Sequence, residues 1–192
     1  FQPAIEEGMR QQLAEVAAIA ADTAAPTFEN TVVRLERSGT LLRRANKVFA
    51  ALTQANTNDT LQQVDTEEAP RLAAHRDAIF LNDTLFQRIK SLYDRRSALG
   101  LDSVQQFLVE RYYRDFVRAG ARLSPADKAA LRALNREEAT LTTDFEKRLL
   151  AATKAAALVV DDSTQLDGLS AGDMAAAAQA ARDRNLPGKW VL

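Results

Sequence analysis

Three arginines, Arg111, Arg114 and Arg118, form the arrangement of charged side chains best suited to binding chemistry in this sequence. Spacings of three and four residues place them on one face of a helix. Guanidinium groups suit the recognition of a carboxylate, because they donate hydrogen bonds in pairs. The stripe is therefore a candidate for an anionic group or a peptide carboxylate. The alternative is a solvated face, on which Glu110 pairs with Arg114 and Arg111 with Asp115.

The remaining reactive side chains do not form a recognisable site. His75 is the only histidine, and a peptidase zinc site needs two histidines one turn apart plus an acid. We therefore expect His75 to be a helix-surface or half-buried residue. Three pairs of adjacent carboxylates also occur: Glu67–Glu68, Glu137–Glu138 and Asp161–Asp162. Adjacent helical residues point about 100° apart, so the first two pairs do not converge on one site, and the third is typical of a turn. The residues alone predict no catalytic and no metal-binding residue.

The composition is that of an ordinary globular protein, with 46% hydrophobic and 27% charged residues in a chain of 192. A formal net charge of -1 favours neither nucleic acid nor a membrane surface as a partner. The absence of cysteine excludes disulfides, thiolate catalysis and cysteine-type zinc sites. Because the chain begins at Phe1 rather than Met and stops in the β-prone run GKWVL, we expect a piece of a longer protein.

Apolar residues recur with helical spacing through most of the chain. The first expected helices cover about 3–21, 28–38 and 40–55, with a break at ANTND (55–59). The helical pattern then continues from Leu61 to Ile79, and Pro70 inside it predicts a kink or a break near Glu68. Further helices are expected after Asn82, over 102–120 and over 124–157.

The longest of these segments organises the expected fold. Ser124 and Pro125 begin it, and no Gly or Pro interrupts it up to Ala157. Its apolar stripe consists of Leu131, Leu134, Leu141, Phe145, Leu149 and Ala152. The short link after Gly120 makes it the partner of 102–120 in an antiparallel hairpin. We predict an all-α, multi-helix bundle built on this hairpin (102–120 and 124–157), with two short β-strands near 158–160 and 189–192. The domains are expected to be 1–157, helical, and 158–192, the truncated start of a small strand–helix–strand element.

Six segments together resemble one enzyme family: FQPAIEEGM, PTFENTV, ANTND, LAAHRDAI, ERYYRDFVRAGARLS and ALVVDD. They are similar, in the same order, to the N-terminal part of the thimet-oligopeptidase-like zinc metallopeptidases. Within that family, the peptidyl-dipeptidase (dipeptidyl carboxypeptidase) branch of bacteria is the most similar. None of the six segments is a catalytic motif.

The resemblance implies a helical lobe that forms one wall of a substrate channel and admits only short peptides. The zinc of such enzymes is held by an HExxH helix and a further Glu in their C-terminal part, and no HExxH occurs here. The expected cofactor is therefore one zinc ion in the parent enzyme and none in this chain. The expected partners are the C-terminal catalytic lobe of the same protein and short peptides, with no nucleic acid and no membrane. Arg111, Arg114 and Arg118 become candidate channel residues, and the compartment stays open between bacterial cytoplasm and periplasm.

Overall fold

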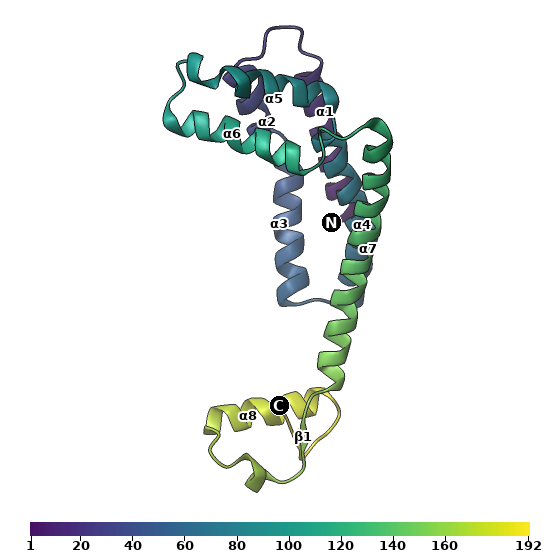
Figure 1. The fold of residues 1–192 in the computed structure, drawn as a ribbon. Coiled ribbons are helices and arrows are strands. Elements are labelled where there is room, and N and C mark those ends of the chain that lie inside the picture. The colour runs from purple at the N-terminus through teal and green to yellow at the C-terminus, as the bar shows by residue number, and fades with distance from the viewer. The chain divides into compact units, whose positions relative to one another are not determined.

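The computed structural model describes all residues, 1–192, as two compact units, Phe1–Asp144 and Phe145–Leu192 (Figure 1). The expected all-α fold with two short strands is confirmed. No helix combines the length and the apolar character that crossing a bilayer requires.

The first unit consists of seven α-helices and two short irregular helices. Their bounds in chain order are α1 Gln2–Ala20, the π-helix η1 Phe28–Val33, α2 Arg34–Arg37, α3 Thr40–Ala55, α4 Asp59–Phe80, α5 Asp83–Arg95, the 3₁₀-helix η2 Arg96–Ala98, α6 Ser103–Arg118 and α7 Pro125–Ala155, whose final residues belong to the second unit. Side-chain caps define several starts, as the sequence predicts. The Asn82 side chain accepts from the Leu85 amide, and Asp102 forms a capping box with Gln105.

Two apolar clusters hold the first unit together. The larger joins α1, η1, α2, α4, α5 and α6 through Val16, Ile19, Val32, Leu35, Ile79, Leu85, Phe86, Ile89, Leu92, Val109, Phe116 and Ala121. Within it the rings of Tyr93 and Tyr113 stack with their centroids 3.8 Å apart, which fixes α5 against α6. The smaller cluster places Ile5 of α1 against Leu42 and Phe49 of α3.

Two local features differ from the sequence-based expectation. Helix α4 passes through Pro70 without a break, so the break near Glu68 does not occur and the kink stays a prediction. Packing of α4 against α1 offsets the one backbone hydrogen bond that proline removes. The segment after Thr27 is a π-helix rather than an α-helix up to Val33, a rare form that is often associated with functional sites.

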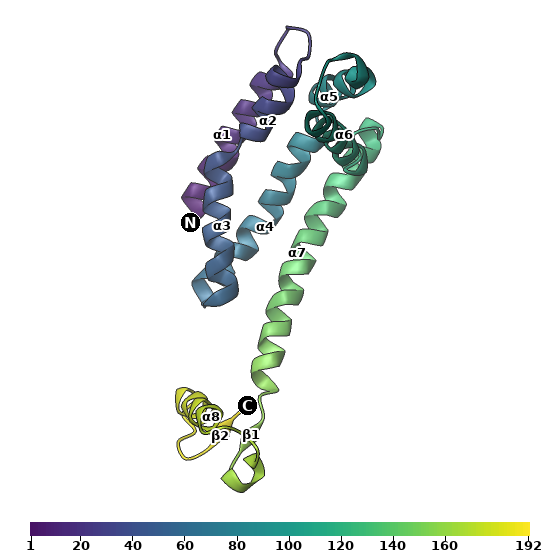
Figure 2. The same cartoon turned by 90° about the vertical axis from the view of Figure 1, so that its left-hand side faces the viewer.

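The two helices of the expected hairpin are present, but they diverge. Gly120, with φ +98°, forms the corner between them. From that corner the part of α7 up to Asp144 turns away from α6 (Figures 1 and 2). The reason is that α6 already packs on α5, so α7 instead follows α4. Leu134 and Leu141 of the predicted apolar stripe are consequently 61% and 60% exposed.

The second unit is small and contains the only sheet. Its elements after α7 are β1 Val159–Val160, the 3₁₀-helix η3 Ser163–Leu166, α8 Ala171–Asp183 and β2 Trp190–Val191. The strands are antiparallel, with Val159 opposite Val191 and Val160 opposite Trp190. Helix α8 begins with the capping box of Ser170 and Asp173 and packs on β2. The two strands confirm the β-prone runs found in the sequence.

Candidate functional site

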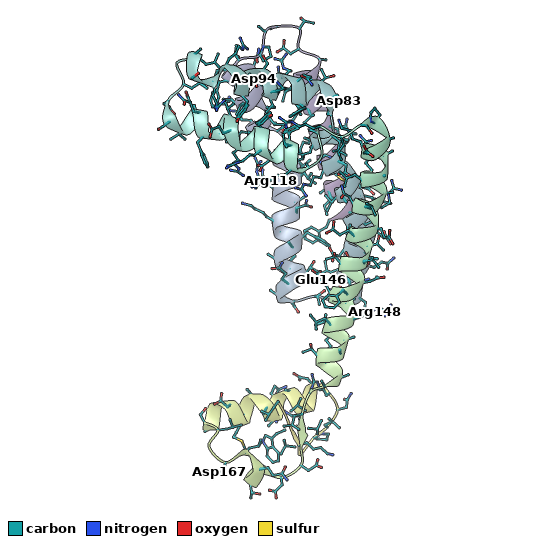
Figure 3. All side chains as sticks on the ribbon, in the orientation of Figure 1. Asp83, Asp94, Arg118, Glu146, Arg148 and Asp167 are labelled. Atoms are coloured by element: carbon teal, nitrogen blue, oxygen red, sulfur yellow. The ribbon has the colours of Figure 1, made fainter.

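The three arginines of the predicted stripe are all exposed on α6, but their surroundings differ. Arg111 Nε lies 3.6 Å from the Asp115 carboxylate, as the solvated-face alternative expects. Glu110 accepts from Arg96 at 2.9 Å instead of pairing with Arg114. Of the three, Arg118 lines a pocket of about 460 Å³ at the C-terminal end of α6 (Figure 3). The role of the stripe as a channel surface stays a prediction.

The pocket beside Arg118 is formed by α4, α6 and the first half of α7. It has a volume of about 460 Å³. Its main lining side chains are Arg76, Asp77, Phe80, Arg118, Leu131 and Asn135. A second pocket of about 280 Å³ shares Arg76, Asp77 and Asn135 with it and continues between α4 and α7. The two pockets are adjacent, and together we call them the α4–α7 groove.

Asp77 is the most constrained side chain of this groove. It is 6% exposed, and its Oδ1 accepts a hydrogen bond of 2.7 Å from the Asn135 side-chain amide. Its Oδ2 is buried and has no hydrogen-bond partner. A buried carboxylate oxygen without a donor is unfavourable, so a donor that reaches this atom stabilises it. Because the atom is buried, a neighbouring side chain has to move before a bound molecule can contact it.

Opposite charges surround Asp77 in the groove. The Arg76 guanidinium lies over the Phe80 ring, 5.5 Å from its centroid, and makes no ion pair. Arg118 likewise has no hydrogen-bond or ion-pair partner, while Asp115 on the same wall is held by Arg111. The groove thus presents two guanidinium groups without ion pairs beside the partly satisfied carboxylate of Asp77. Asp115 and Glu138 add two further carboxylates to its lining.

The opposite flank of α4 carries the single histidine and a buried glutamate. His75 is 8% exposed, more buried than expected, and its Nε2 lies 2.8 Å from Gln12 Oε1 of α1. Burial lowers the pKa of His75 and raises the pKa of Glu68, which is 1% exposed and accepts from Arg71 at 2.9 Å. Glu67 is exposed, so this pair of carboxylates does not share a site. These groups connect α4 to α1 and line no pocket.

The residues of this chain do not fit a zinc site. No three side chains of His, Asp or Glu lie close enough together to hold a metal ion. No step of a zinc-dependent reaction can therefore be assigned to them.

Sequence reasoning identified Arg118 but missed Arg76, Asp77 and Asn135. The adjacent pair Arg76–Asp77 lies within LAAHRDAI, one of the segments that carry the family resemblance. Asp77 falls on the flank of α4 that faces Asn135, 58 residues further on. Only the tertiary structure brings α4, α6 and α7 together at this point.

Comparisons with known proteins show two similar proteins of known activity. No family model matches it. It is 49% identical over 192 residues to the dipeptidyl carboxypeptidase of Escherichia coli (strain K12) and 46% identical over 192 residues to that of Salmonella typhimurium (strain LT2). The matches cover 100% of this chain and 28% of each relative.

The chain is thus similar to part of a peptidase. More specifically, the chain is a homologue of a segment of dipeptidyl carboxypeptidase, which confirms the branch that its motifs indicated. Because it spans only 28% of those relatives, the activity of a whole protein is a separate question.

Proposed function

We propose that the chain is the N-terminal helical lobe of a zinc-dependent peptidyl-dipeptidase, which releases C-terminal dipeptides from short peptides. The observation that carries this proposal is the 49% identity to a dipeptidyl carboxypeptidase over the whole chain. The six segments that resemble the family support the proposal, because they are spread from residue 1 to residue 162.

In this proposal the lobe forms one wall of the substrate channel and restricts the enzyme to short peptides. The remainder of the protein supplies the HExxH helix, the further Glu and the zinc ion, and the lobe alone is inactive. The exposed Leu134 and Leu141 of α7 support an interface with that catalytic lobe, because solvent-exposed leucines in one row of a helix are typical of a contact surface.

An endo-acting oligopeptidase of the same family is the alternative within the enzyme class. A peptide with a C-terminal amide separates the two. A peptidyl-dipeptidase that needs the free carboxylate fails to cleave this peptide, whereas an endopeptidase cleaves it. A helical interaction module without catalysis is the alternative outside that class.

The direct test compares the 192-residue chain with the protein made from the complete reading frame. Zinc content and dipeptide release are measured for both. We expect zinc and activity in the longer protein only. If the longer protein has neither zinc nor dipeptide release, the enzyme proposal fails and the interaction module is favoured.

A further inference from the structure

We propose that the α4–α7 groove binds a small zwitterion of dipeptide size, with its carboxylate on Arg118 and its amino group on Asp77. The inference rests on the proposed function only for the choice of a dipeptide as the ligand. The recognition itself follows from the charges and the burial of the lining side chains.

The amino end of the ligand is assigned by Asp77. One carboxylate oxygen of Asp77 is satisfied by Asn135, and the other is buried without a donor. An ammonium group carries three donors and a positive charge, so it satisfies the free oxygen and compensates the charge of the carboxylate. The Arg76 side chain beside it is exposed and free of ion pairs, so it can rotate to admit the ligand.

The carboxylate end is assigned by Arg118. This guanidinium lines the same pocket from the opposite helix and has no partner within the protein. A planar guanidinium matches a carboxylate with two parallel hydrogen bonds. Arg76, on α4, adds a second positive charge to the pocket, so a carboxylate is favoured in it over a neutral group.

Size and apolar lining favour a compact ligand. A volume of about 460 Å³ lies at the small end of the range for small-molecule sites, roughly 300–1,000 Å³. Phe80 and Leu131 provide apolar contact for a side chain of the ligand, and alanines line the continuation of the groove. The presence of both charge signs in one pocket favours a ligand that carries both charges over a simple anion or a simple cation.

The test is calorimetric titration of the 192-residue chain with the dipeptide Ala-Leu and with two derivatives that each lack one charge. N-acetyl-Ala-Leu lacks the ammonium group, and Ala-Leu amide lacks the carboxylate. We expect saturable binding of Ala-Leu and about tenfold weaker binding of each derivative, because a charge-assisted hydrogen bond is lost in each case.

Two variants assign the two ends of the ligand. Asp77→Asn is expected to weaken the binding of Ala-Leu by about tenfold and to leave the affinity for the acetylated peptide unchanged. Arg118→Gln is expected to weaken the binding of Ala-Leu to a similar extent and to leave the affinity for Ala-Leu amide unchanged. Arg114→Gln is the matched control, because Arg114 is exposed on the same helix and does not line this pocket.

The outcomes separate this proposal from the proposed function. Absence of saturable Ala-Leu binding, or equal binding by wild type and Arg118→Gln, overturns the assignment of the groove. Arg118 is exposed, so its variant remains informative even if Asp77→Asn fails to fold. Binding by the chain together with no dipeptide release by the longer protein overturns only the peptidase proposal.

Discussion

Arg88 Nη1 donates a hydrogen bond of 2.6 Å to the backbone carbonyl oxygen of Asp22, although 66 residues separate them. The same guanidinium donates to the Ala24 carbonyl at 3.1 Å and to Asn30 Oδ1 at 3.0 Å. Arg88 is 6% exposed, so one buried side chain ties the loop after α1 and the π-helix to α5. The PTFENTV segment thus depends on a distant arginine for its conformation.

Arg88→Ala is expected to lower the free energy of unfolding by about 2–4 kcal/mol, because three part-buried hydrogen bonds from a buried guanidinium are lost. Gln87→Ala is the control, since Gln87 lies on the same helix but is exposed, and it should cost less than about 1 kcal/mol. Urea denaturation measures both. Equal effects of the two substitutions would show that Arg88 does not hold the loop.

Gly8 permits the close approach of α1 and α3. A Cβ atom at this position would lie 2.7 Å from the Leu42 backbone nitrogen and Cα. Gly8→Ala is therefore expected to destabilise the protein by about 1–3 kcal/mol, despite the better helix propensity of alanine. The matched control is Gly172→Ala in α8, where the nearest atom is 3.6 Å away and a gain of up to about 1 kcal/mol is expected. Thermal unfolding followed by circular dichroism compares the stability of the two variants. Higher stability than wild type in both variants would contradict the steric argument.

The burial of His75 predicts a stability that depends on pH. Burial lowers the pKa of His75 in the folded state below its ordinary value of 6.5. The unfolded state therefore takes up the proton first, and the contribution of His75 is fully present above pH 6.5 and decreases as the pH falls below it. We expect wild type to lose more stability between pH 7 and pH 5 than His75→Gln.

The comparison with the variant is necessary because the titration of Glu68 changes stability with pH in the opposite direction. Burial raises the pKa of Glu68, so its contribution increases as the pH falls through the raised value. Urea midpoints of both proteins across this range isolate the histidine. Parallel curves for wild type and His75→Gln would exclude the predicted titration.

The exposed leucines of α7 test the proposed interface with a catalytic lobe. In the 192-residue chain, Leu134→Gln and Leu141→Gln are each expected to change stability by less than about 0.5 kcal/mol. In the longer protein each should cost about 1–2 kcal/mol, because the side chains become buried. Leu92→Ala, at a fully buried position, is the positive control and should cost about 2–5 kcal/mol in both. Small effects of the α7 substitutions in both proteins would contradict the interface.

The sequence by itself determined the features that depend on near neighbours. The capping box of Asp102 and Gln105 forms within one turn, so the start of α6 is visible in the residue types. The break at ANTND and the corner at Gly39, with φ +66°, are equally local. The family resemblance also lay in the sequence, because it depends on residue identity rather than on position in space.

Only the tertiary structure decided which helix faces meet. A periodic stripe shows that a helix has an apolar face, but it does not show what covers it, so the exposure of Leu134 on α7 could not be predicted. The same holds for the α4–α7 groove, where Asp77, Arg118 and Asn135 come from three different helices. Contacts between residues far apart in the chain are set by the packing of whole elements, and no local pattern encodes them.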